Sequence, residues 1–364
     1  MSGVSLKNKL ILPFLLILIL FVCSFLNFTA PESNSTQKSS DTLILEGEVH
    51  FKNMKMLTQR GENAEAYFSF DNARLVFQSR SGDMQCDQIY TMNIDGSDKK
   101  MVSNGKGATT CSYFYPDGKS ILYASTFLGG DDCPPKPDFS KGYVWALYDT
   151  YDIFKANDDG SNIVQLTKEK GYDAEATISP KGDKIVFTST RDGDIELYSM
   201  NLDGSGVKRL THEIGYDGGA YYNNDGTKIV YRASRPKTDE EKKEFKDLLD
   251  EGLVRPHSLD IYVMDADGTN NIQVTNNGAA NFAPFFFPDG NRIIFCSNMD
   301  DPQGRDFNLY AINVDGTGLE RITYSNTFDG FPMFSFDGKK FVFCSNRFNA
   351  APHETNVFIC DWVN

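Results

Sequence analysis

The amino-acid sequence predicts an all-β fold: a six-bladed β-propeller of four-stranded blades, closed by pairing of an N-terminal strand with the C-terminal blade. Three observations predict it. A hairpin pattern recurs six times, further strand patterns follow the hairpins at fixed spacing, and the two chain ends carry complementary parts of one blade. Self-similarity at a fixed period is the sequence signature of propellers and other repeat architectures.

Each unit opens with two short apolar strands joined by a tight turn. An Asp-Gly pair between apolar runs is a strong hairpin signal, because a two-residue turn needs positive φ angles that Gly and Asn adopt at little cost. The six turns are Asp71-Asn72, Asp117-Gly118, Lys181-Gly182, Asp225-Gly226, Asp289-Gly290 and Asp337-Gly338. The strands after them read LVF, ILY, IVF, IVY, IIF and FVF, each ending on an aromatic residue.

A third strand in each unit also ends on an aromatic residue: Tyr90, Phe154, Tyr198, Tyr262, Tyr310 and Phe358. Six residues after the first five of these lies a turn glycine: Gly96, Gly160, Gly204, Gly268 and Gly316. Six residues further on lies an aliphatic residue of the fourth strand: Val102, Leu166, Leu210, Val274 and Ile322. This constant spacing predicts four strands in every blade.

The two chain ends complete each other. Residues 356–358 form a third strand with no fourth strand after it, and residues 57–58 end a fourth strand with no third strand before it. We expect residues 50–58 to pair beside residues 356–362. Such closure removes a free sheet edge that would invite aggregation.

The third unit, residues 174–211, reads AEATISPKGDKIVFTSTRDGDIELYSMNLDGSGVKRLT. With the other units it resembles the TolB-like propeller repeat, over about residues 50–364. The resemblance implies a six-bladed propeller of the cell envelope that acts through protein contacts. TolB also has an N-terminal α/β domain, for which we expect no room in this chain. Similar repeats also occur as non-catalytic propellers attached to peptidases.

Residues 1–30 predict a signal peptide or a membrane anchor. Lys7 and Lys9 precede an apolar run at 10–28, which is just long enough to span a bilayer, and the basic flank predicts that the rest of the chain is exported. A cleaved signal and lipidation of Cys23 are the alternatives. We expect the protein in the periplasm or on the outer face of the membrane.

After this segment, residues 31–45 read as a Ser-containing flexible linker and residues 46–364 as the propeller. The formal net charge of −14 makes nucleic acid a poor partner and favours cationic peptides or metal ions. The membrane is expected to be contacted only through the N-terminal segment, and the propeller to be monomeric. No H-E-x-x-H, G-x-S-x-G or Gly-rich phosphate loop occurs, so no catalytic residue is assigned.

Units two and four depart from the repeat. Their second-strand and third-strand aromatics are 31 residues apart, against 11 in unit three, so each carries an insert in the same loop. That loop shares a face of the ring with the blade-to-blade loops, and this face is the candidate binding surface. The candidate contact residues are Tyr143, Trp145, Tyr148 and Arg235. In the unit-four insert, Thr238 and Glu241 predict a capped short helix ending near Gly252.

The blade-to-blade loops carry a side-chain oxygen eight residues before each first turn. These residues are Asn63, Thr109, Asp173, Asp217, Asn281 and Asp329, and Glu65 and Glu175 are counted with them. Around a channel mouth, this set could hold a hard cation such as Ca²⁺ or receive a basic peptide. The alternative is structural. Asp and Asn fix their own turns, and the arginines that end the second strands (Arg80, Arg191, Arg235 and Arg347) pair with these Asp residues.

Seven cysteines in an exported chain predict a disulfide. Cys296, Cys344 and Cys360 fall in strand patterns and read as small buried residues. Of Cys86, Cys111 and Cys133, we predict that Cys86 pairs with Cys111.

The functional expectation is a non-catalytic propeller of the cell envelope that binds a protein or peptide at the face carrying the two inserts. Two alternatives remain open: a metal-dependent hydrolase at the channel mouth, which chelation would inactivate, and an accessory propeller that gates a separate peptidase.

Overall fold

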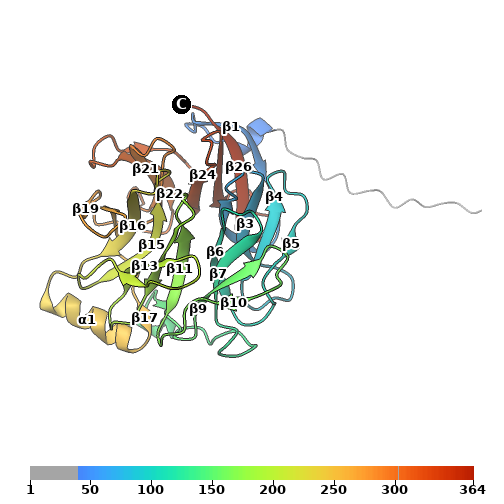
Figure 1. The fold of residues 1–364 in the computed structure, drawn as a ribbon. Coiled ribbons are helices and arrows are strands. Elements are labelled where there is room, and N and C mark those ends of the chain that lie inside the picture. The colour runs from blue at the N-terminus through green and yellow to red at the C-terminus, as the bar shows by residue number, and fades with distance from the viewer. Residues whose placement is uncertain (1–39, 302) are drawn as a thin grey trace, which may run out of the picture. The chain divides into compact units, whose positions relative to one another are not determined.

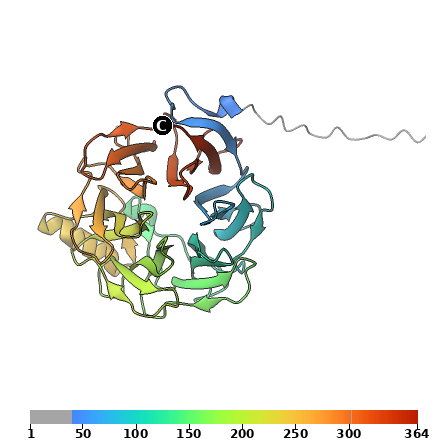
Figure 2. The same cartoon turned by 45° about the horizontal axis from the view of Figure 1, so that its top comes forward.

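Six four-stranded antiparallel sheets stand around a common axis in the computed structural model, which describes residues 40–301 and 303–364 (Figures 1 and 2). The predicted six-bladed propeller is therefore confirmed. The expectations for the export segment, for Cys23 and for most of the linker fall outside the described residues. Among the described helices, none has the length and apolar character needed to cross a membrane.

The first blade consists of β2 (Glu62–Phe68), β3 (Arg74–Arg80), β4 (Gln88–Asn93) and β5 (Lys100–Met101). The second consists of β6 (Thr109–Phe114), β7 (Ser120–Ser125), β9 (Asp152–Asn157) and β10 (Val164–Gln165). The third consists of β11 (Asp173–Ile178), β12 (Lys184–Ser189), β13 (Glu196–Asn201) and β14 (Lys208–Arg209). Strand β6, the first strand of the second blade, contacts both β2 and β11, the first strands of its two neighbours.

The fourth blade consists of β15 (Tyr216–Tyr222), β16 (Lys228–Ser234), β18 (Asp260–Asp265) and β19 (Ile272–Gln273). The fifth consists of β20 (Asn281–Phe286), β21 (Arg292–Ser297), β22 (Asn308–Asn313) and β23 (Glu320–Arg321). The sixth consists of β24 (Asp329–Phe334), β25 (Lys340–Ser345), β26 (Asn356–Trp362) and β1 (Phe51–Met56). Five of the six outermost strands are two residues long, which leaves little free edge for pairing with another chain.

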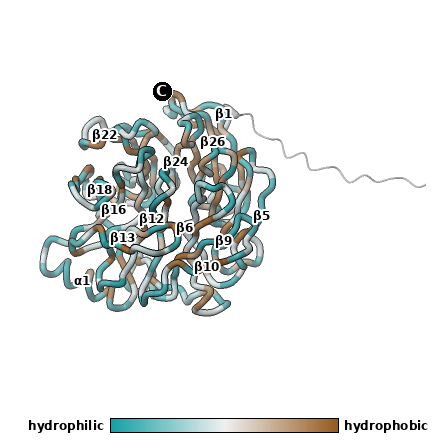
Figure 3. Tube along the Cα trace, viewed as in Figure 1, coloured by the Kyte–Doolittle hydropathy of each residue, from teal (hydrophilic) through white to brown (hydrophobic). Residues whose placement is uncertain are grey.

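The aromatic residues that mark the second and third strands pack against each other in every blade. The directly opposed pairs are Phe77–Tyr90, Tyr123–Phe154, Phe187–Tyr198, Tyr231–Tyr262, Phe295–Tyr310 and Phe343–Phe358, with ring centroids 5.5–6.1 Å apart. An aromatic pair of this kind contributes about 0.5–1.5 kcal/mol beyond the area it buries. Figure 3 shows the hydrophobic residues gathered along the strands, while the helix labelled α1 is largely hydrophilic.

The ring closes as predicted. Strand β1 pairs antiparallel with β26, with Phe51 opposite Trp362 and Met56 opposite Phe358. The ring of His50 stacks on Trp362 at a centroid distance of 4.9 Å. The last blade is therefore built from both ends of the propeller.

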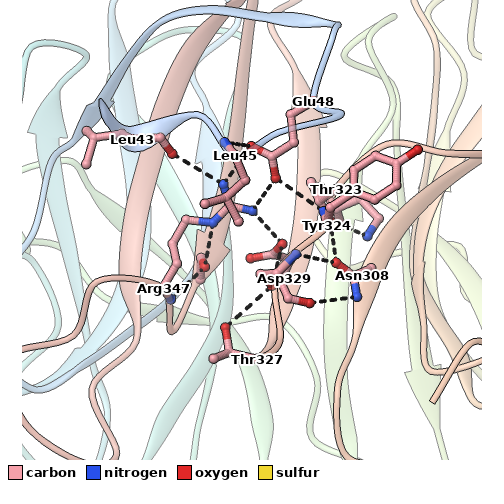
Figure 4. Close-up of polar contacts among 12 residues, drawn as sticks. Leu43, Leu45, Glu48, Asn308, Thr323, Tyr324, Thr327, Asp329 and Arg347 are labelled. Atoms are coloured by element: carbon pink, nitrogen blue, oxygen red, sulfur yellow. Dashed lines mark hydrogen bonds and ion pairs between the residues drawn. The ribbon is translucent and has the colours of Figure 1, made fainter. Parts of the chain in front are cut away.

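A buried ionic contact fastens the chain before β1 to the sixth blade (Figure 4). Arg347 donates from both terminal nitrogens to the Glu48 carboxylate, at 2.9 and 2.8 Å, and Nη2 also donates to Asp329 at 2.6 Å. All three side chains are buried. This contact, which follows the short 3-10 helix η1 (Ser40–Leu43), adds a second closure that the sequence analysis missed.

The inner strand of every blade has a β-bulge at the same place. The register with the second strand shifts there in all six blades. One residue of each bulge has a positive φ angle: Glu65, Cys111, Glu175, Gly219, Ala283 and Phe331, with φ between 49° and 58°. A bulge re-aims a side chain, and these six residues line the central cavity described below.

Candidate functional site

The two inserts meet and form a roof, which we define as residues 126–151 and 235–259. Strand β8 (Trp145–Ala146) of the blade-two insert pairs antiparallel with β17 (Leu253–Val254) of the blade-four insert. The predicted helix is present as α1 (Asp239–Asp250), and the capping box of Thr238 and Glu241 is confirmed. In Figure 1, α1 and β17 lie at the bottom of the ring.

Side chains from all six inner strands fill the axis of the propeller, each from the position two residues after the bulge residue. Those six positions are occupied by the buried residues Tyr67, Tyr113, Thr177, Tyr221, Phe285 and Met333. Tyr221 of blade four donates a hydrogen bond of 2.6 Å to the hydroxyl of Tyr67 in blade one, on the opposite side of the six-membered ring. The rings of four of them, Tyr67, Tyr113, Tyr221 and Phe285, contact one another, and we call the six side chains the floor.

A cavity of about 270 Å³ lies between this floor and the roof. The six bulge residues line its wall. The side toward the roof is lined by Trp145, Leu147, Tyr148 and Tyr151 of the blade-two insert. The site is thus assembled from all six inner strands and one insert. Small-molecule sites of proteins have this enclosed, largely apolar character with a few polar groups.

Glu175 is held by four donors at one side of the cavity. Arg232 Nη2 and the Tyr216 hydroxyl donate to Oε1, and Thr188 Oγ1 and the backbone N–H of Gly219 donate to Oε2 at 2.8 Å. Both charged side chains of the Arg232–Glu175 pair are about nine-tenths buried. The guanidinium also stands over the Trp145 ring, at 5.5 Å from its centroid.

Glu65, on the blade-one bulge, has a different environment. No Lys or Arg of the described residues forms an ion pair with it; the Cys111 thiol donates a hydrogen bond to it. Burial raises the pKa of Glu65 to about 7, and repulsion from Glu175 adds to the rise. The pKa of Cys111 is raised well above its usual value by burial and by both carboxylates, so this cysteine stays a thiol at neutral pH.

Of the residues predicted at the channel mouth, two line the cavity, Glu65 and Glu175, and six do not: Asn63, Thr109, Asp173, Asp217, Asn281 and Asp329. Asp173, Asp217 and Asp329 are buried and accept hydrogen bonds from Arg191, Arg235 and Arg347, at 3.0, 2.5 and 2.6 Å. Asn63, Thr109 and Asn281 bond to backbone carbonyls of their surroundings. All six positions therefore have the structural role that was the alternative interpretation, in which each side chain holds its own loop. The residue two positions later in each strand lies at the bulge and lines the cavity, as Glu65 and Glu175 do.

The arginine partners also bear on the calcium prediction. A carboxylate that is already neutralised by a buried guanidinium is a poor ligand for a cation. Among residues 40–301 and 303–364, no three His, Cys, Asp or Glu side chains come together as a metal site. The described part of the chain therefore offers no such group of side chains for the predicted Ca²⁺ ion.

The predicted insert residues divide between the roof surface and its underside. Tyr143 is 68% exposed, and its hydroxyl accepts a hydrogen bond of 3.0 Å from Trp145. Trp145 and Tyr148 line the cavity. Arg235 is the first residue of the blade-four part of the roof; it pairs with Asp217 and Glu213 and does not line the cavity.

The predicted disulfide between Cys86 and Cys111 is wrong. Cys86 is bonded to Cys133 of the blade-two insert, with the two Cα atoms 5.8 Å apart. Cys111 lies on the blade-two bulge, whose backbone directs it into the cavity beside Glu65, away from Cys86. The bond therefore ties the insert of blade two to blade one.

Comparison with known proteins supports this architecture. The family model of the TolB β-propeller domain matches residues 137–246 and 247–357. A putative TolB from Agrobacterium tumefaciens is similar in structure, with 18% identity, a TM-score of 0.55, and coverage of 84% of this chain and 91% of that one. TolB from Acinetobacter baumannii gives 18% identity and a TM-score of 0.50, covering 70% of this chain and 53% of that one.

Hydrazine synthase from Kuenenia stuttgartiensis is also similar, at 15% identity and a TM-score of 0.53, covering 72% of this chain and 39% of that one. Likeness at these identities establishes the fold alone, since one propeller fold serves many unrelated functions.

Proposed function

Because this chain belongs to the TolB β-propeller domain family, we propose that it is an exported binding propeller of the cell envelope that receives a protein or peptide on the outer surface of its roof. Export is supported by the basic and then apolar start of the sequence. The binding role is supported by the roof, which is the part of the described chain that departs most from the repeat.

The observation that carries the proposal is the exposure of large apolar side chains on the blade-two insert. Leu128, Phe139 and Tyr143 are 57%, 55% and 68% exposed, and only Val49 among the described large apolar residues exceeds this range. Phe139 opens a short 3-10 helix, η2 (Phe139–Lys141), whose cap is Asp138. Exposed aromatic residues on a folded, disulfide-anchored segment are favoured anchors for a protein partner.

The test is crosslinking followed by affinity capture of the full chain from detergent-solubilised envelopes. Phe139→Ser combined with Tyr143→Ser removes both roof aromatics. The matched control combines Val164→Ser with Ile272→Ser, since both side chains are 53% exposed on the outermost strands β10 and β19. We expect a partner that the wild type and the control capture equally and that the roof variant loses.

Thermal melts of both variants must match the wild type before capture is compared. Equal capture by all three proteins would show that the roof aromatics are not the anchor. Loss from the control and the roof variant alike would show that capture follows general surface hydrophobicity.

A further inference from the structure

The central cavity has polar groups that the fold leaves only partly paired. Glu65 forms no ion pair among the described residues, whereas Glu175 is saturated by Arg232 and its neighbours. Ser112 is another residue of the cavity wall, and its buried hydroxyl has no hydrogen-bond partner among the described residues. Buried polar groups are almost always hydrogen-bonded. Their presence on a hollow wall indicates a ligand with polar or charged character.

The charges on the cavity wall favour a ligand that carries a positive charge. The carboxyl and guanidinium groups among the residues that line the cavity belong to Glu65, Glu175 and Arg232, so two negative charges face one positive charge once Glu65 is ionised. Arg232 already donates from Nη2 to Glu175 and to the Tyr216 hydroxyl, although its Nε has no hydrogen-bond partner among the described residues. An anion would meet an uncompensated carboxylate, whereas a cation would neutralise it. The net charge of −14 also raises the local concentration of cations.

The remaining wall is aromatic. The rings of Tyr148, Tyr151 and Tyr172 follow one another at centroid distances of 6.2 and 5.7 Å, and Trp145 lies on the same side of the roof. Aromatic faces attract ammonium groups through their quadrupoles, and the attraction is strongest where water is excluded. Tyr67 and Tyr221, which are buried and hydrogen-bonded to each other, also line the cavity.

We propose that this cavity is a binding site for a small organic cation, a protonated or quaternary alkylammonium compound, with Glu65 as its counter-ion and the aromatic wall around its alkyl groups. An organic cation is favoured over a metal ion, because no three His, Cys, Asp or Glu side chains come together as a metal site among residues 40–301 and 303–364. The cation site does not rest on the binding role of the roof, since its ligand lies beneath the roof and not on it.

The proposal implies a particular dependence on pH. The ionisable groups that interact with Glu65 are Cys111, Glu175, Arg232 and Asp87, together with the hydroxyls of Tyr67, Tyr151 and Tyr221 and the thiol of Cys344. Burial raises the pKa of Glu65 to about 7. The cation binds the ionised carboxylate, so binding lowers this pKa and releases a proton. We expect the affinity for a quaternary ammonium ion to rise from about pH 6 to about pH 8, where the free carboxyl group loses its proton.

The experiment is titration calorimetry on the full chain with choline chloride, and with 3,3-dimethylbutan-1-ol as its neutral isostere. Trp145 fluorescence reports whether the ligand reaches the cavity, because this ring lines it. Glu65→Gln removes the counter-ion, and Ala283→Leu fills the cavity from the blade-five bulge without changing its charge. Glu62→Gln is the matched control, since Glu62 lies on the same strand but pairs with Arg80 outside the cavity.

We expect saturable choline binding by the wild type and by Glu62→Gln, weakened about tenfold or more by Glu65→Gln and abolished by Ala283→Leu. The neutral isostere should bind more weakly than choline to the wild type. Absence of saturable choline binding by the wild type overturns the proposal. Equal binding of choline and its isostere, or equal affinity in wild type and Glu65→Gln, also overturns it, because the cavity would then recognise apolar shape alone.

Discussion

Gly219 is the one glycine among the six bulge residues, and its replacement by alanine tests how the cavity is built. A Cβ atom at this position would lie 1.8 Å from Nη1 and 2.9 Å from Cζ of Arg232. Positive φ is not the obstacle, since the other five bulge residues carry side chains at φ angles of 49° to 56°. The guanidinium occupies the space that a side chain would need, so Gly219→Ala forces Arg232 away from Glu175.

The magnitude has two parts. Alanine at positive φ costs about 1 kcal/mol relative to glycine. Displacing Arg232 leaves the Glu175 carboxylate buried with only neutral donors, and breaking a buried ion pair from one side costs about 3–5 kcal/mol. We therefore expect Gly219→Ala to lower the free energy of unfolding by about 4–6 kcal/mol.

Urea denaturation of a double-mutant cycle measures this effect. In an Arg232→Ala background the clash is absent, so Gly219→Ala should cost only about 1 kcal/mol there. Ala283→Gly, at the equivalent bulge of blade five, is the control and should change the free energy of unfolding by less than about 1 kcal/mol. The reasoning is refuted if Gly219→Ala costs the same with and without Arg232.

Three further predictions concern the closure, the disulfide and the cavity. Glu48→Gln removes a charged acceptor of Arg347 and should cost about 2–3 kcal/mol, measured by urea denaturation, with faster amide exchange around residues 45–51. Reduction of the Cys86–Cys133 bond, which spans 47 residues, should lower the free energy of unfolding by about 4 kcal/mol, and Cys133→Ser should lose as much without reductant. The pKa of Glu65 is raised from 4.5 to about 7, so its stabilising contribution is complete below 4.5 and is lost as the pH rises through 7. The unfolding free energy of wild type relative to Glu65→Gln should accordingly fall between these values, and a constant difference would contradict the raised pKa.

Local patterns were sufficient to predict the blades. In most blades the turn pair and the aromatic residues of the second and third strands lie close together in the sequence. Their regular spacing was enough to predict which two aromatic residues lie opposite each other. Tyr231 opposite Tyr262 is the instructive case, because the register survived an insert between them. Pairing of β1 with β26 was also predictable, because each end of the propeller sequence holds part of a blade and the two parts together make a complete one.

Glu65 and Glu175 were predicted at the channel mouth and do line the cavity, but the six predicted residues that lie two positions before the bulge residues do not. Asp217 has the residue type of a ligand, but its oxygen points to Arg235 inside the blade, and Gly219 faces the axis. A bulge shifts the alternation of a strand without changing its composition, so spacing alone cannot locate it. The sequence does contain one signal. Arg232 is the only charged residue at its second-strand position among the six blades, and the strand paired with it carries two adjacent glycines, at positions 218–219.

The other omissions involve partners that are distant in the sequence. Glu48 meets Arg347 across 299 residues, and the two inserts meet through β8 and β17. The choice of Cys133 over Cys111 for the bond to Cys86 depends on the path of the blade-two insert, which has no repeat to fix it. Contacts of this kind follow from the assembled ring and not from any one unit.

The roof is the central element of this account, and site-specific photo-crosslinking tests it most directly. A photoreactive amino acid is placed at Tyr143 in one protein and at Ile272, on the outermost strand β19, in another, and both are irradiated in intact cells. We predict a discrete crosslinked partner from position 143 and none of that mass from position 272. The same partner from position 272, or no crosslink from position 143, would contradict binding at the roof.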